Sequence, residues 1–84
     1  MRLLGLGMVL LSASFVAARA DAVDACRARH AEVTKQADQF SGDSMTKRLI
    51  EADLRRAASE MVEYDADECN EALDHATKLL SGDY

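Results

Sequence analysis

Apolar residues recur every three or four positions along three separate segments of the chain, and this spacing constrains the fold more than any other feature. Because it repeats once per helical turn, each segment places an apolar stripe along one face of an α-helix. The stripes are Val23, Cys26, His30, Val33, Ala37 and Phe40; Ile50, Leu54, Ala57, Met61 and Tyr64; and Ala66, Cys69, Leu73, Ala76 and Leu80. The chain has no proline and few aromatic residues, which also favours helices over strands. We therefore predict an all-α fold with helices at about 22–40, 45–64 and 66–81.

Two short breaks separate the stripes and carry signals for helix starts. The first, SGDS, offers a glycine and helix-capping side chains. At the second, Asp65 is placed to cap the third helix, with Glu68 as its capping-box partner. Tyr64 precedes this cap, where it would make a hydrophobic contact with Cys69. Short connections make neighbouring helices antiparallel, so the expected fold is a small up-down-up three-helix bundle.

The first twenty residues predict a secretory signal peptide. They begin with Arg2, continue as an uncharged run, and end in Ala18-Arg19-Ala20, an A-x-A cleavage site. A permanent membrane anchor would need roughly 20 apolar residues, and this run is shorter and interrupted by glycine and serine. We expect residues 1–20 to be removed and residues 21–84 to form a helical domain that is periplasmic or secreted. No stable membrane insertion is expected after cleavage.

The two cysteines are predicted to form a disulfide. Export favours oxidised cysteines, and the up-down-up topology brings the first turns of the first and third helices, with Cys26 and Cys69, to the same end of the bundle. The bond would contribute up to about 4 kcal/mol to a small domain. The alternative is a zinc site with Cys26, His30 and Cys69 as three of its four ligands, although no CxxC or HxxxH pair is present. We predict the disulfide, with no metal and no cofactor.

The charge of the mature chain restricts its partners. Loss of Arg2 and Arg19 leaves 8 basic against 15 acidic residues, a net charge of −7. Nucleic-acid binding depends on lysine and arginine at the phosphate backbone, and anionic membranes attract the same residues. We therefore expect neither nucleic acid nor an anionic membrane surface as a partner.

A run of six carboxylates without a basic residue follows the second helix. They are Glu63, Asp65, Asp67, Glu68, Glu71 and Asp74. Helix capping accounts for Asp65 and Glu68. The others, Glu63, Asp67, Glu71 and Asp74, are candidates for a patch that steers a basic partner, against the alternative of a solvated helix face.

His30 interrupts the first apolar stripe and is a candidate pH sensor. If its ring were buried in the neutral form, acid would charge it and loosen the bundle. The alternative is a hydrogen-bonded, partly hydrated ring at the edge of the core.

An enzyme is not expected. So small a bundle should leave no room for a concave pocket of several hundred Å³, and no nucleophile and base are placed together by the sequence. We expect a non-enzymatic module that binds another exported protein, which would be basic if the acidic patch binds it. The alternatives are an acid-responsive periplasmic chaperone and a metal-binding protein acting through Cys26, His30 and Cys69. The sequence does not set the oligomeric state.

Overall fold

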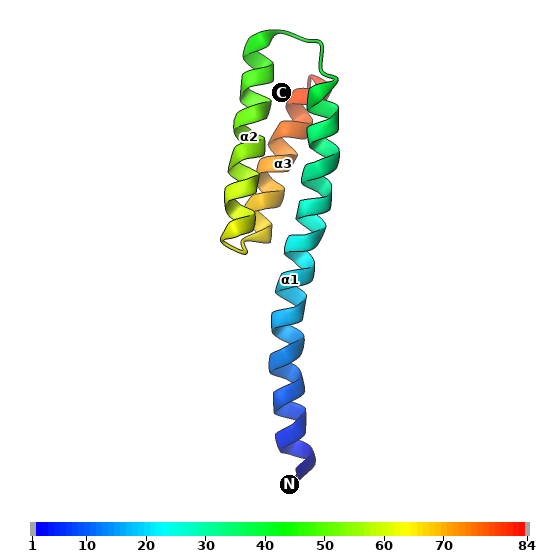
Figure 1. The fold of residues 1–84 in the computed structure, drawn as a ribbon, viewed down its shortest axis with the longest axis vertical. Coiled ribbons are helices and arrows are strands. Elements are labelled where there is room, and N and C mark those ends of the chain that lie inside the picture. The colour runs from blue at the N-terminus through cyan, green and yellow to red at the C-terminus, as the bar shows by residue number, and fades with distance from the viewer. Residues whose placement is uncertain (1, 84) are drawn as a thin grey trace.

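The computed structural model describes the backbone of residues 2–83 and the side chains of residues 17–83. It contains three helices, α1 (Arg2–Asp38), α2 (Ser44–Val62) and α3 (Ala66–Ser81). They run up, down and up, and each helix packs against the other two (Figure 1). The prediction of an all-α three-helix bundle is therefore confirmed.

The predicted signal peptide falls mainly on residues 1–16, whose side chains lie outside the described part of the chain, so it stays a prediction. Within the part that is described, no helix combines the length and the apolar character needed to cross a membrane.

The core follows most of the three predicted stripes, but it also includes Ala72 and Leu79, and the stripe residues His30, Phe40, Ala66 and Leu80 are only half-buried. Its buried apolar residues are Val23, Cys26, Val33 and Ala37 on α1, Ile50, Leu54, Ala57 and Met61 on α2, and Cys69, Ala72, Leu73, Ala76 and Leu79 on α3. In the last turn of α3, Leu79 is buried and Leu80 only half-buried. Leu80 lies at the end of the bundle, where it lines an open groove together with Phe40 and Gly42. Leu79 follows Ala76 by three positions and continues the core face of α3, so Leu80 lies at the edge of that face.

The connection between α1 and α2 follows the predicted capping chemistry. Asp43 is the N-cap of α2, and its carboxylate accepts hydrogen bonds from the Thr46 backbone N–H and hydroxyl, both at 2.8 Å. These bonds hold the pKa of Asp43 below its ordinary value, since they favour the charged carboxylate. The Phe40 ring lies against Gly42 so closely that a Cβ at this position would overlap the ring. A larger residue here would therefore require the Phe40 ring to move.

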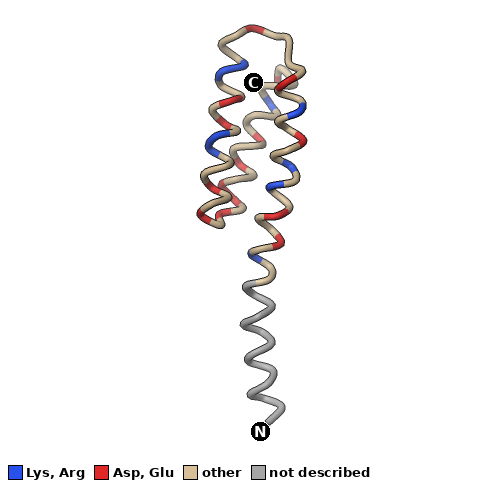
Figure 2. The backbone as a smooth tube through the Cα atoms, in the orientation of Figure 1, with Lys and Arg blue, Asp and Glu red and all other residues tan. Residues whose placement is uncertain are grey.

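The connection between α2 and α3 is a Schellman turn, in which the residue after the helix adopts a left-handed conformation. Tyr64 occupies this position with φ 56°. The Tyr64 N–H donates to the Met61 carbonyl at 3.1 Å, and the Asp65 N–H donates to the Glu60 carbonyl at 2.9 Å. Figure 2 shows acidic residues gathered around this turn.

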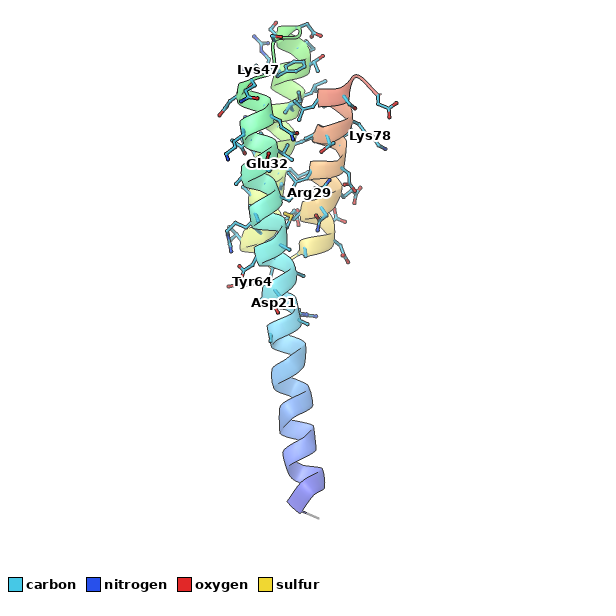
Figure 3. All side chains as sticks on the ribbon, turned by 90° about the vertical axis from the view of Figure 1, so that its right-hand side faces the viewer. Asp21, Arg29, Glu32, Lys47, Tyr64 and Lys78 are labelled. Carbon is cyan, nitrogen blue, oxygen red and sulfur yellow. A yellow bond between two sulfur atoms is a disulfide. The ribbon has the colours of Figure 1, made fainter. Side chains whose placement is uncertain are left out.

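Two details predicted for this turn are wrong. Asp65 does cap α3, since its carboxylate accepts from the Glu68 N–H at 3.1 Å. The return bond of a capping box is absent, because the Asp65 N–H is used by the turn and the Glu68 carboxylate pairs with Arg56. The left-handed backbone also turns Tyr64 away from the core, so its side chain is 68% exposed instead of contacting Cys69 (Figure 3).

The predicted disulfide is confirmed. Cys26 on α1 and Cys69 on α3 are bonded, with their Cα atoms 6.4 Å apart. Both residues are buried in the core. The bond joins the first and third helices at the end of the bundle where α2 turns into α3, as the topology requires.

Candidate functional site

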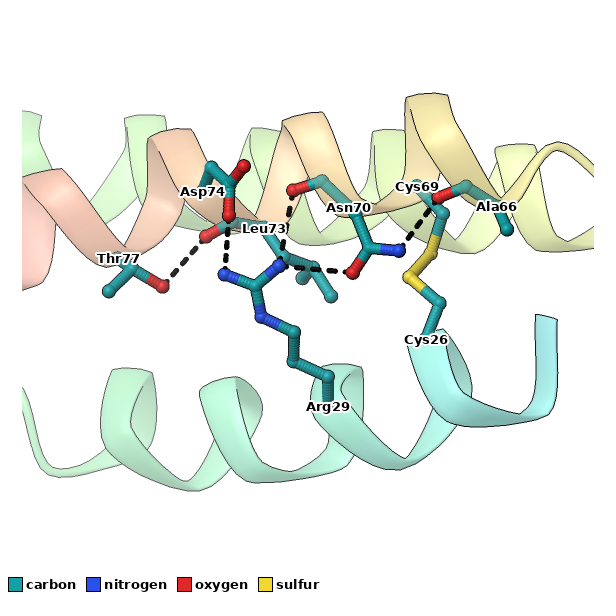
Figure 4. Close-up of polar contacts among 8 residues, drawn as sticks. All are labelled: Cys26, Arg29, Ala66, Cys69, Asn70, Leu73, Asp74 and Thr77. Atoms are coloured by element: carbon teal, nitrogen blue, oxygen red, sulfur yellow. Dashed lines mark hydrogen bonds and ion pairs between the residues drawn. A yellow bond between two sulfur atoms is a disulfide. The ribbon is translucent and has the colours of Figure 1, made fainter. Parts of the chain in front are cut away.

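The acidic run of α3 contains three carboxylates, Glu68, Glu71 and Asp74, that form ion pairs with arginines from other helices. On the α1 side, Arg29 donates to the Asp74 carboxylate at 2.6 Å and to the Asn70 side-chain oxygen at 3.0 Å (Figure 4). A longer bond of 3.4 Å reaches the Asn70 carbonyl. Arg29 lies one helical turn from Cys26, so this contact continues the junction of α1 and α3 beyond the disulfide. The Asp74 side chain is 61% exposed while it makes this ion pair, so its place in the candidate patch stays a prediction.

On the α2 side, Arg56 lies against the same run. Its guanidinium is 3.0 Å from the Glu68 carboxylate and 3.9 Å from that of Glu71. All three side chains are substantially exposed, so each pair contributes less than about 1 kcal/mol to stability. Arg56 offsets part of the negative charge on this side of α3.

The remaining candidates, Glu63 and Asp67, lie on a groove between the α2–α3 turn and α1, which we call the turn groove. It has a volume of about 490 Å³ and is lined by Ala18, Arg19, Ala22, Glu63, Tyr64, Asp65, Ala66 and Asp67. One wall of the groove is formed by α1 and the other by the α2–α3 turn. Figure 3 shows that this part of α1 and the turn lie at nearly the same height along the molecule, as marked by Asp21 and Tyr64. Val62, next to the turn wall, is 80% exposed. The turn groove thus combines carboxylates with exposed apolar and aromatic groups.

The charge around the turn is strong enough to affect a neighbouring acid. Partial burial of its carboxyl group, together with the negative charges of Glu63, Asp65 and Glu68, raises the pKa of Glu60. A cation placed near this turn would relieve the same repulsion. The potential around this turn is therefore negative.

A second open groove, of about 580 Å³, lies at the opposite end of the bundle. It is lined by Gln36, Gln39, Phe40, Ser41, Gly42, Thr77, Leu80 and Ser81, none of which is ionisable. The argument that so small a bundle has no room for a hollow of this size is therefore wrong. Neither set of lining residues contains a histidine or a cysteine to activate a nucleophile.

Sequence reasoning missed a polar pair between α2 and α3. The Asp53 carboxylate is 2.5 Å from His75 Nδ1, and Asp53 is buried. The sequence does contain a signal for the burial of Asp53. This residue follows Ile50 by three positions and precedes Ala57 by four, which places it on the apolar stripe of the second helix. The His75 side chain is 57% exposed, yet it supplies the partner that the buried carboxylate needs.

His30 is half-buried, and its Nε2 donates a hydrogen bond to the Leu54 carbonyl at 3.0 Å. Since the carbonyl only accepts, this bond is compatible with both the neutral and the charged ring. A role in pH sensing stays a prediction. Cys26 and Cys69 are joined in the disulfide, so neither offers a thiolate to a metal in this state. Across the described residues, no group of three or more His, Cys, Asp and Glu side chains is arranged to hold a metal ion.

Comparison with known proteins finds no match for this chain among family models, curated proteins or solved structures.

Proposed function

We propose that the mature chain is an exported, non-enzymatic module that binds another protein through the turn groove. The observation that carries this proposal is the turn wall of the groove, where Glu63, Asp65 and Asp67 lie beside the exposed Tyr64. The mature chain would keep this wall, whereas Ala18 and Arg19 of the α1 wall would be removed with the leader. Tyrosine is enriched among residues that dominate binding energy at interfaces. Carboxylates around it would steer a basic partner toward the groove and set its orientation.

The proposed export is compatible with the packing of α1. The first buried residue of the described chain is Val23, three positions after the predicted cleavage site. Removal of residues 1–20 would therefore leave the described core and the disulfide intact. Intact-mass analysis of material from the periplasm or culture supernatant should give the mass of a chain beginning at Asp21, and an unprocessed chain would contradict the export step.

The ion pairs of α3 support a recognition surface smaller than the whole acidic run. Asp74 and Glu71 face Arg29 and Arg56, so their substitution would disturb contacts between helices as well as a partner. Glu63 and Asp67 are exposed and line the groove. They are therefore the positions at which charge can be removed with the least effect on the fold.

The test is a pull-down from exported fractions with tagged mature protein. Glu63→Gln combined with Asp67→Asn should lose a partner that the wild type retains, and raised salt should weaken the wild-type interaction. The matched control is Glu32→Gln with Glu51→Gln, which removes the same charge at exposed positions outside the groove. The captured protein is then purified and its direct binding measured. Equal binding by both variants would contradict the proposal.

An acid-responsive chaperone is the second candidate. It is favoured by Asp43, whose lowered pKa means that its stabilising effect on α2 is present at neutral pH and is lost as pH falls through the folded-state pKa. This alternative predicts suppression of client aggregation at about pH 3 and none at about pH 7. Inactivity at both would exclude it.

A further inference from the structure

The α1 wall of the turn groove contains residues from both sides of the predicted cleavage site. Ala18 and Arg19 precede the bond after Ala20, whereas Ala22 follows it. Arg19 is the one basic residue among those that line the groove. Processing would therefore remove a guanidinium from a surface that keeps Glu63, Asp65 and Asp67.

The position of Arg19 indicates what kind of group the groove accepts. Three carboxylates on the turn wall face a groove whose other wall carries this cation. An arginine is well suited to such a place, because its planar guanidinium donates to carboxylates and also stacks on aromatic rings such as that of Tyr64. Arg19 thus has the chemistry that a basic partner would bring to the same surface.

We infer that the leader segment masks the turn groove through Arg19, and that cleavage after Ala20 opens the groove to an arginine side chain of a basic partner. This inference rests on the proposed function, because it concerns the regulation of the same surface. Before processing, a partner arginine must compete with Arg19, which is held at the groove by the chain. After processing, this competitor is gone and the wall formed by residues 63–67 remains.

The new amino terminus would not replace Arg19. Asp21 is not among the residues that line the groove, and its own carboxylate lies next to the new amino group. The core begins at Val23, so the shorter chain retains every described buried residue and the disulfide. A change in binding on processing would therefore come from the groove and not from unfolding.

The test measures binding of a fluorescent peptide of alternating arginine and alanine, with citrulline in place of arginine as the uncharged control. Three proteins are compared in the same detergent: the full chain, the full chain with Arg19→Gln, and the chain beginning at Asp21. Circular dichroism and the mass of the intact disulfide check that each is folded. The processed chain and the Arg19→Gln chain should both bind the arginine peptide about threefold to fivefold more tightly than the unmodified full chain.

The outcomes separate this inference from the function on which it rests. If all three proteins bind the arginine peptide equally, masking by Arg19 is contradicted while the proposed binding function stands. If the processed chain is tighter but Arg19→Gln is unchanged, the leader acts by some means other than Arg19 and the inference is overturned. If none of the three prefers the arginine peptide over the citrulline peptide, both the inference and the basic-partner function fail.

Discussion

Tyr64 has a left-handed backbone conformation that is unfavourable for its residue type. A left-handed backbone costs an L-residue with a Cβ roughly 1–2 kcal/mol, and glycine is the usual occupant of this turn position. Tyr64 adopts φ 56° and also leaves its ring 68% exposed. Neither helix termination nor core packing requires a tyrosine here. Retention of an aromatic ring at a strained, exposed position fits its proposed role in the turn groove.

Tyr64→Gly should therefore separate stability from binding. Glycine relieves the left-handed strain but increases the entropy of the unfolded chain, so we expect a net gain of up to about 1 kcal/mol. Tyr64→Ala keeps the Cβ and should show no such gain. Thermal unfolding measures the stability of both variants. A lower melting temperature for Tyr64→Gly than for Tyr64→Ala would contradict the claim that the backbone at Tyr64 is strained.

The raised pKa of Glu60 predicts that its contribution to stability depends on pH. Its pKa is raised by partial burial and by Glu63, Asp65 and Glu68, so its protonated form stabilises the fold at low pH. This contribution is lost as pH rises through the folded-state pKa. Glu60→Gln should therefore be more stable than the wild type at neutral pH, with little difference below the ordinary glutamate pKa of 4.5. Denaturant unfolding at several pH values measures the free energy of unfolding of both proteins. If Glu60→Gln were less stable than the wild type at neutral pH, repulsion between Glu60 and its acidic neighbours would be contradicted.

At the scale of the elements, α2 and α3 are joined by a polar contact inside an otherwise apolar interface. Asp53 is buried on the core side of α2 and meets His75 of α3 at 2.5 Å. Such a pair adds little net stability compared with apolar packing, but removal of one member leaves the other without its partner. It therefore favours this particular alignment of the two helices.

A double-mutant cycle tests the contact. His75→Ala alone should cost about 1 kcal/mol, because it leaves the buried carboxylate without its partner. In combination with Asp53→Ala, the two changes should be less than additive by about 0.5 kcal/mol or more. Additive costs in denaturant unfolding would show that the contact does not couple the helices.

The elements themselves are predictable because their signals are local. Heptad spacing and capping residues lie within a few positions of the helices they specify, and α2 and α3 match the predicted bounds within two residues. The long-range polar contacts are not predictable in this way. Arg29 and Asp74 are 45 residues apart, and no local pattern links them. The spacing of Tyr64 continues the stripe of α2 and therefore predicts a core position. The left-handed turn instead directs its side chain toward solvent.

The whole molecule is a small bundle whose first and third helices are covalently joined. The disulfide follows from topology and redox compartment together, since an up-down-up chain brings Cys26 and Cys69 to one end. It lies beside the Arg29 contact (Figure 4). The disulfide fixes the first turn of α3 against α1, so it holds the turn wall of residues 63–67 in place as well as stabilising the fold.

Cys69→Ser should lower the free energy of unfolding by up to about 4 kcal/mol, because the unfolded chain loses its cross-link. Reduction of the wild type should have a similar effect, measured by thermal unfolding with and without reductant. An unchanged melting temperature would show that helix packing alone holds α1 in place.

The central claim, that the turn groove is the recognition surface, is tested most directly by amide NMR of the chain beginning at Asp21. On titration with the arginine–alanine peptide, the largest shifts should fall on the amides of residues 63–67, which form the turn wall. The amides of residues 36–42, beside the second groove, serve as the internal control and should stay in place. Largest shifts at residues 36–42, or no shifts at residues 63–67 at saturating peptide, would contradict the claim.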